Sequence, residues 1–174
     1  MRAPSAAGPA PAIVALGSNL GDSALLLREA REALARLACA PLRSSSLWRT
    51  EPVDCPPGSP AFLNAVVLLL PRASASPERL LDQLQAIERQ FGRQPKRQLN
   101  EARPLDLDLI AWGGSTLATA RLILPHPRAA VRRFVLAPLA ELAPDLVLPG
   151  QTRTVRQLLA ALPETPGAAC LGPF

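Results

Sequence analysis

Two carboxylates lie two residues apart in the segment Arg103-Pro104-Leu105-Asp106-Leu107-Asp108-Leu109-Ile110. Read as a β-strand, this segment puts its leucines on one face and Asp106 and Asp108 side by side on the other. Neighbouring like charges repel, so such a pair is expected where a cation neutralises it. Carboxylate oxygens suit one or two magnesium ions, which commonly bring phosphate, and Arg103 could balance the remaining phosphate charge. The alternative is an edge strand with a solvated acidic face.

A second pair of residues suits a flat ligand. Phe62 and Asn64 lie in an expected strand over residues 62–70 and share one of its faces by alternation. An aromatic ring beside an amide, which both donates and accepts, fits a flat heterocycle. A core phenylalanine beside a hydrogen-bonded asparagine is the alternative. The only histidine, His126, lies between two prolines that fix its position, and it is either a turn residue or a catalytic group.

A basic loop over residues 93–102 leads into the aspartate strand and carries Arg93, Lys96 and Arg97. Such a loop is either solvated surface or the phosphate-binding rim of a magnesium site. The turn from Gly17 to Asp22 contains two glycines but lacks the Gly-Lys-Ser/Thr of a Walker loop. We therefore interpret this turn as a strand-to-helix connection and not as a phosphate cradle.

Composition limits the class of protein. The chain has 174 residues, 48% hydrophobic and 19% charged, which is typical of one soluble globular domain. No apolar run approaches the ~18–20 residues of a membrane-spanning helix, and three cysteines at no metal or redox spacing indicate reduced thiols. We therefore expect a cytoplasmic protein with no membrane contact. The net charge of +5, with 18 of 19 basic residues arginine, suits a polyanion, either nucleotide phosphates or nucleic acid.

The expected elements follow the order strand, helix, strand, strand, helix, strand, then a hairpin and small helices. This is the ferredoxin-like βαββαβ plan of the α+β class, with helices on one face of a mainly antiparallel sheet and loops over the other. We expect a single domain over 12–162, a disordered N-terminal tail over 1–11 and a C-terminal tail over 163–174. The expected strands are 12–16, 42–50, 62–70 and 103–112, the helices 25–39 and 77–91, and the hairpin 117–124.

Six short motifs occur in the order, and near the spacing, of one known family. They are Ala15–Asp22, Arg49-Thr50-x-Pro52, Phe62–Val66, Ile87-Glu88 with Gly92-Arg93, Arg103-x-Leu105-Asp106-Leu107-Asp108, and Leu124–Arg128. Each motif alone is weak evidence. The ordered set, over residues 12 to 149, resembles the 6-hydroxymethyl-7,8-dihydropterin pyrophosphokinase family of folate biosynthesis.

The resemblance implies that pyrophosphate passes from ATP to the hydroxymethyl group of the pterin, with release of AMP. Asp106 and Asp108 match the pair that binds two magnesium ions, and with Arg93 and Arg103 they are the expected catalytic residues. We expect a monomer whose partners are ATP and the pterin. Pterin contacts are implied for Thr50, Val53, Phe62, Asn64 and Phe134, and ATP contacts for Gln85, Glu88, Arg93, Arg103, His126 and Arg132.

The chain also departs from the family's pattern. Many members carry Arg-Trp-Gly-Pro-Arg before the aspartate strand, whereas this chain reads Leu99-Asn100-Glu101-Ala102-Arg103, and only the last arginine matches. The resemblance therefore does not extend to the family's closing loop. Trp48 stands where a tyrosine is common, and Pro127 follows the histidine where others have an aromatic residue.

An RNA-binding module of the same fold is the competing class. Such modules present aromatic residues for base stacking on their central strands. This chain has no tyrosine and only 3% aromatic residues, and its paired aspartates would repel a phosphate backbone. We therefore expect no nucleic-acid partner.

Overall fold

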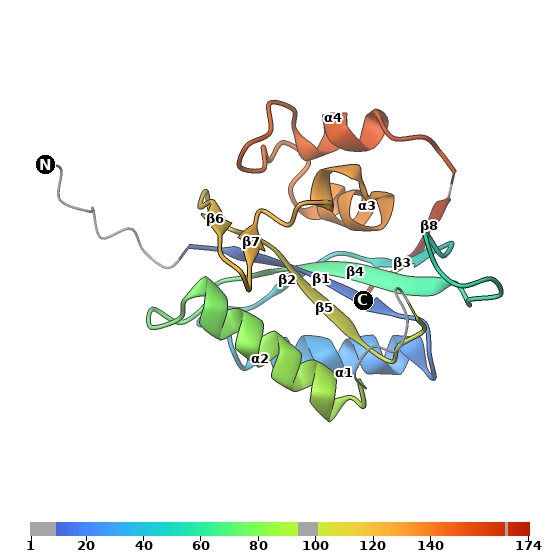
Figure 1. The fold of residues 1–174 in the computed structure, drawn as a ribbon, viewed down its shortest axis with the longest axis horizontal. Coiled ribbons are helices and arrows are strands. Elements are labelled where there is room, and N and C mark those ends of the chain that lie inside the picture. Colours follow the sequence, from blue (N-terminus) through green and yellow to red (C-terminus); the bar gives the residue numbers. More distant parts are fainter. Residues whose placement is uncertain (1–9, 94–100, 166) are drawn as a thin grey trace, which may run out of the picture.

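The computed structural model describes residues 10–93, 101–165 and 167–174, and it has three layers (Figure 1). A sheet lies in the middle, with α1 and α2 below it and α3 and α4 above it in this view. The helices are α1 (Ser23–Ala35), α2 (Pro77–Gln90), α3 (Arg133–Leu142) and α4 (Val155–Ala160), with a 3-10 turn η1 (Ala129–Val131) before α3. The strands are β1 (Ala12–Ser18), β2 (Arg43–Ser44), β3 (Leu47–Thr50), β4 (Phe62–Leu69), β5 (Asp106–Trp112), β6 (Leu117–Ala118), β7 (Ile123–Leu124) and β8 (Ala168–Gly172).

The main sheet confirms the predicted ferredoxin-like plan. Its strand order is β5-β1-β4-β3-β8, with β2 pairing with β4, and its strand pairs are antiparallel. Residues 117–124 were expected to return after the strand 103–112; instead they form the hairpin β6–β7, a separate two-stranded sheet. The long helices begin at side-chain caps, because Asp22 accepts a hydrogen bond from the Leu25 N–H and Ser76 accepts one from the Arg79 N–H.

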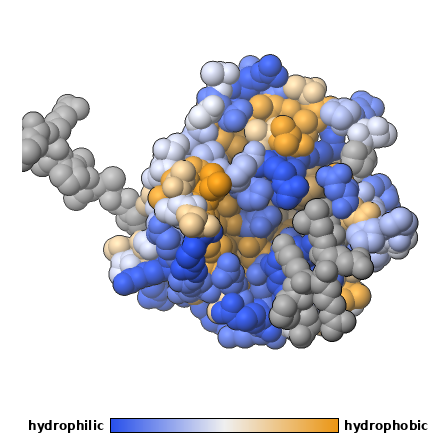
Figure 2. All heavy atoms as spheres, viewed as in Figure 1, coloured by the Kyte–Doolittle hydropathy of each residue, from blue (hydrophilic) through white to orange (hydrophobic). Residues whose placement is uncertain are grey.

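Alternation along the strands gives the sheet two apolar faces. Leu105, Leu107 and Leu109 point into a buried cluster with the apolar sides of α1 and α2, as their period predicts. A second buried cluster lies between the sheet and α3 and α4, and includes Val66 and Leu136. Loops were expected over this second face, but α3 and α4 cover part of it. In Figure 2, hydrophobic residues gather mainly in the upper part, around these two helices.

Three local predictions differ from the structure. The helix expected over 25–39 is α1, which ends at Ala35. The strand expected over 42–50 is divided into β2 and β3. Between them, Ser45 continues the contact with β4 through its side chain, because its Oγ accepts a hydrogen bond from the Val66 N–H at 3.0 Å. The expected C-terminal tail over 163–174 contains β8, which pairs with β3.

Most of the expected N-terminal tail, residues 1–9, lies outside the described residues. None of the helices that the structure describes is long and apolar enough to cross a membrane.

Candidate active site

A cavity of about 350 Å³ lies on the α3 side of the sheet, over the ends of β1, β4 and β5. The structure brings together every predicted site residue in its lining except Gln85 and Glu88, although these residues come from distant parts of the chain. The predicted residues that line it are Thr50, Val53, Phe62, Asn64, Arg93, Arg103, Asp106, Asp108, His126, Arg132 and Phe134.

The floor of the cavity is made by small residues of β1. Gly17 pairs with Asn64 of β4 on one side and with Asp106 of β5 on the other. A Cβ atom on Gly17 would lie 3.1 Å from Asn64 Oδ1 and 3.9 Å from Asp106 Cβ. The missing side chain therefore keeps the floor open between the amide and the carboxylate. The role of Gly17 in the cavity floor was not predicted from the sequence. The pattern that could have indicated it is the decrease in side-chain size along Ile13, Ala15 and Gly17, on the face of the sheet that carries the aspartates.

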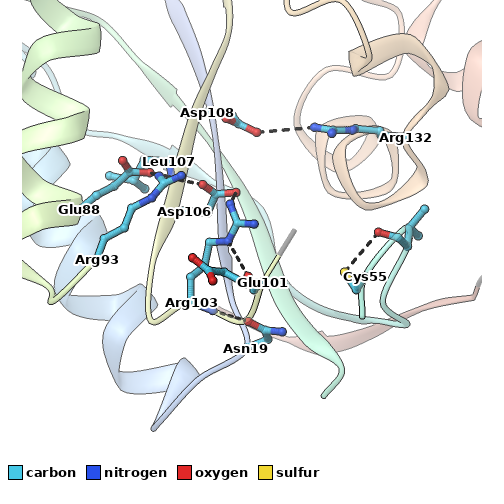
Figure 3. Close-up of polar contacts among 11 residues, drawn as sticks. Asn19, Cys55, Glu88, Arg93, Glu101, Arg103, Asp106, Leu107, Asp108 and Arg132 are labelled. Carbon is cyan, nitrogen blue, oxygen red and sulfur yellow. Dashed lines mark hydrogen bonds and ion pairs between the residues drawn. The ribbon is translucent and has the colours of Figure 1, made fainter. Parts of the chain in front are cut away.

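Asp106 lies between two arginines, as Figure 3 shows. Its Oδ1 is 2.9 Å from Arg93 Nη1 and its Oδ2 is 3.1 Å from Arg103 Nη1. Asp108, the next carboxylate on the same face of β5, has its Oδ2 3.6 Å from Arg132 Nη1. The negative charges of β5 are therefore met by guanidinium groups that reach it from the end of α2, the start of β5 and the start of α3.

Arg93 reaches the cavity because α2 ends at Gly92. This glycine has a φ of 84°, a left-handed conformation that glycine adopts without strain. The chain turns there, and the Arg93 N–H donates to the Glu88 carbonyl at 3.0 Å. The predicted helix end at Gly92 is thus confirmed, and it directs a cation toward Asp106.

Arg103 is held by Asn19, a residue of the glycine-containing turn. The Arg103 N–H donates to Asn19 Oδ1 at 2.9 Å, and the Asn19 N–H donates to the Arg103 carbonyl at 3.2 Å (Figure 3). The Nδ2 of Asn19 also donates to the carbonyl of Pro60 at 3.3 Å. Asn19 was part of a recognised motif but was not predicted as a site residue, since its partners lie 84 and 41 positions away.

The aspartate pair suits magnesium. About a third of the Asp108 side chain is exposed to the cavity, so its oxygens are accessible. Burial, and then the neighbouring charge of Asp106, raise the pKa of Asp108 above its ordinary value. A bound cation would relieve this unfavourable pairing. No group of three or more His, Cys, Asp or Glu side chains suited to a metal occurs among the described residues. Magnesium is often bound by only one or two carboxylates, with water and substrate phosphates as its other ligands.

The other end of the cavity combines a buried amide with two aromatic rings, which together suit a flat polar ligand. Asn64 is buried, and its Nδ2 donates to Thr50 Oγ1 at 2.7 Å, which fixes the orientation of the amide. Phe62 of β4 and Phe134 of α3 line the same cavity. The guanidinium of Arg132 lies 5.2 Å from the centre of the Phe134 ring, in a cation–π contact.

His126 is fixed in one tautomer. Its Nδ1 accepts a hydrogen bond from the Arg128 N–H at 3.2 Å, so in the neutral ring the proton is on Nε2. Its own backbone N–H donates to the Ile110 carbonyl at 2.8 Å. Burial lowers the pKa of His126 and the charge of Asp108 opposes this shift, so at neutral pH the ring is a neutral donor.

The two predicted residues of α2 lie apart from the cavity. Gln85 is exposed, whereas Glu88 is buried behind the aspartate strand. The carboxylate of Glu88 accepts a hydrogen bond from the Leu107 N–H at 2.7 Å and pairs with Arg93. The contacts of Gln85 and Glu88 with ATP stay a prediction. In this structure Glu88 instead contacts Leu107, the neighbour of Asp106 in the chain, and Arg93, which pairs with Asp106.

Glu88 should make stability depend on pH. Burial raises its pKa from 4.5 to about 7, against the opposing effects of Leu107 and Arg93. The native state therefore binds this proton more tightly than the unfolded state, and the contribution of Glu88 to stability falls as pH rises from about 4.5 to about 7. Glu88→Gln removes the titration and keeps an acceptor for Leu107. In urea unfolding, we expect the free energy of unfolding of the wild type to fall by roughly 3 kcal/mol relative to that of the variant across this window. A difference between the two proteins that stays constant with pH would contradict this prediction.

Fold and site together define a ferredoxin-like protein whose main cavity combines an end lined by paired aspartates and arginines with an end lined by a buried asparagine and two phenylalanines. Comparison with known proteins identifies the family. The family model of 7,8-dihydro-6-hydroxymethylpterin-pyrophosphokinase (HPPK) matches residues 13–144, and the chain belongs to this family.

Named relatives agree with this assignment. The 2-amino-4-hydroxy-6-hydroxymethyldihydropteridine pyrophosphokinase of Synechocystis sp. is 41% identical over 162 residues, which cover 90% of this chain and 81% of the relative. The protein of the same name from Pseudomonas aeruginosa is 43% identical over 152 residues, covering 86% and 90%. A crystal structure of an HPPK-DHPS protein in complex with substrates matches with a TM-score of 0.71 at 12% identity, which shows the shared fold. That match covers 89% of this chain and only 43% of the longer HPPK-DHPS chain.

Proposed function

We propose that this protein transfers pyrophosphate from ATP to the hydroxymethyl group of 6-hydroxymethyl-7,8-dihydropterin, releasing AMP, in folate biosynthesis. One observation carries the proposal: Asp106 and Asp108 share a single cavity with the buried amide of Asn64. The aspartates suit a magnesium-bound triphosphate, and the amide suits the edge of a pterin. Membership of the HPPK family supports this choice of substrates.

The arginines would bind the triphosphate by exchanging partners. Arg93 and Arg103 now pair with Asp106, and Arg132 lies near Asp108. When a magnesium–nucleotide enters, phosphate oxygens can accept from the guanidinium groups while the carboxylates turn to the metal. Each carboxylate and each guanidinium group keeps a partner of opposite charge through this exchange, which favours binding of the highly charged nucleotide. His126, neutral and protonated on Nε2, adds a donor for a phosphate or ribose oxygen.

The pterin end of the cavity would orient the acceptor alcohol. The Asn64 amide is fixed by Thr50, and the rings of Phe62 and Phe134 offer apolar surface to the heterocycle. Gly17 leaves the path open from this amide toward the aspartates. The hydroxymethyl group can thus approach the terminal phosphates held at β5, which is the main requirement for phosphoryl transfer.

Catalysis would rest on positioning and on charge. Magnesium, when bound, stabilises negative charge on the transferring group and lowers the pKa of the alcohol. Arg93 and Arg103 stabilise the same charge by hydrogen bonding and also set the orientation of Asp106. We also propose that the enzyme uses two magnesium ions, is cytoplasmic and is a monomer.

Asn64→Ala should weaken binding of the pterin but not of ATP. The variant loses the amide that faces the cavity and leaves the Thr50 hydroxyl without this partner. We expect the KM for the pterin to rise about 10- to 100-fold, the usual effect of losing a polar contact in a site built to recognise it. The KM for ATP should stay within about twofold. Steady-state kinetics with each substrate varied separately measures both constants, and an equal rise in the two would contradict the assignment.

The proposed reaction is tested by leaving out one component at a time. AMP should form from ATP only when the hydroxymethyl-dihydropterin and magnesium are both present, and chelation by EDTA should stop it. ADP as the product would indicate an ordinary kinase. No nucleotide product would contradict the proposal and favour the RNA-binding alternative, for which salt-sensitive RNA titration is the next measurement.

A further inference from the structure

The C-terminal segment, residues 162–165 and 167–174, lies beyond the part of the chain that the family model matches. Three sets of contacts fasten it. Arg133 Nε donates to the Pro163 carbonyl at 3.0 Å, and Arg133 Nη2 donates to the Leu162 carbonyl at 2.9 Å. Strand β8 pairs with β3 along the edge of the sheet, beside it in Figure 1. At the end of the chain, Arg31 donates to the Phe174 carbonyl and stacks 5.0 Å from its ring.

Two of these contacts adjoin the walls of the pterin end. Arg133 opens α3 and lies between Arg132 and Phe134, which both line the cavity. Strand β3 ends at Thr50, whose partner in β8 is Ala168. The segment therefore connects the beginning of α3 with the end of β3, the two elements that carry Phe134 and the threonine holding Asn64.

A small cavity of about 100 Å³ lies between the segment and these walls, beside the pairing of Thr50 with Ala168. Its inner side is formed by residues that also line the main cavity, among them Thr50, Val53 and Phe134. Its outer side is formed by the C-terminal segment. The outer residues are Leu162, Pro163, Thr165, Gly167 and Ala168. The pterin wall thus has the C-terminal segment behind it and space to shift if that segment is released.

We propose that the C-terminal segment is a strap that positions the pterin-binding wall, and that Arg133 is the positioning residue at its start. This inference rests on the proposed function. Loosening the strap leaves the pairing of Asp106 with Arg93 and Arg103 untouched, because these contacts involve β5, the segment before it and the end of α2. Of the three arginines near the aspartates, only Arg132, which pairs with Asp108, lies beside Arg133. Strap variants should therefore weaken pterin binding more than ATP binding, whereas a segment that only covers the sheet edge would affect both substrates equally or neither.

The test compares full-length variants. Arg133→Ala should raise the KM for the pterin about five- to tenfold, the scale of one ordinary hydrogen bond, with the KM for ATP within about twofold. Arg133→Lys keeps the charge and one donor and should recover part of the loss. Arg31→Ala releases the far end and should shift the pterin KM in the same direction. Arg79→Ala is the matched control, because Arg79 also donates to a backbone carbonyl, that of Ser74, at 3.2 Å, but on α2.

The two KM values and the Tm together show whether the C-terminal segment acts as a strap. An unchanged pterin KM in both Arg133→Ala and Arg31→Ala, at unchanged Tm, would overturn it. A parallel rise in both KM values with a lower Tm would also overturn it, since that result indicates general destabilisation. If the wild-type protein forms no pterin-dependent AMP, the proposed function fails; if the wild type is active and the variants match it, only the strap fails.

Discussion

Asp106→Asn and Asp108→Asn are each expected to lower kcat about a thousandfold or more, the result of losing several kcal/mol of transition-state stabilisation. The two carboxylates are adjacent on one face of β5 and point into the cavity, where three arginines already gather. Asparagine keeps the size of the side chain but removes the charge that attracts a divalent cation. The measurement is single-turnover AMP formation at saturating ATP and pterin.

Folding should survive the Asp108→Asn change. Burial and Asp106 raise the pKa of Asp108, so the charged form is disfavoured in the native state, and a neutral asparagine should not lower the free energy of unfolding. Asp82→Asn is the matched control, because Asp82 also pairs with an arginine, Arg121, but is exposed on α2. Near-normal turnover in the Asp106 or Asp108 variant would contradict the metal assignment, as would an equal loss in the control.

Gly17→Val is expected to reduce kcat/KM for the pterin more than a hundredfold, since the added atoms occupy the floor of the cavity. The Cβ alone would lie 3.1 Å from Asn64 Oδ1, and valine adds two methyl groups beyond it. The backbone should tolerate the change, because valine is favoured in strands and Gly17 is not among the glycines with positive φ. Gly17→Ala should have a smaller effect, because only the Cβ is added.

A matched glycine provides the control for this series. A Cβ on Gly114 would meet nothing within 4 Å, and its φ is not positive, so Gly114→Val should leave both substrates' kinetics unchanged. Equilibrium titration of the pterin, followed by its own fluorescence, separates lost binding from lost chemistry. Wild-type pterin affinity in Gly17→Val would show that the floor does not contact the substrate.

Alternation and element order predicted the fold and the strand faces that carry the paired aspartates and the Phe62–Asn64 pair. Period two placed Asp106 and Asp108 opposite the leucines of β5, and put Phe62 and Asn64 on one face of β4. These patterns are local, so the strand geometry alone determines them. The two ends of α2 were also predicted from local backbone preferences, those of Pro77 at its first position and of Gly92 after its last turn. Both predicted ends agree with the structure.

Contacts between distant segments could not be predicted in this way. The role of Gly17 depends on which residues of β4 and β5 lie beside it, which is a matter of register. Asn19 gains its role from Arg103, 84 residues later. Strand β8 has neither alternation nor β-branched residues, and it exists because β3 offers an open edge and Arg133 fixes the approach. The pairing of Asp106 with Arg93 similarly requires the packing of α2 against β5.

In the proposed reaction two phosphoryl groups move together, and ATP labelled at the β-phosphate shows whether they do. The label should leave the nucleotide and appear in the pterin product in a one-to-one ratio with AMP. An ordinary kinase would transfer only the γ-phosphate, and the label would remain in ADP. Label found in the pterin diphosphate is the predicted result, whereas label retained in the nucleotide pool during turnover would contradict the account.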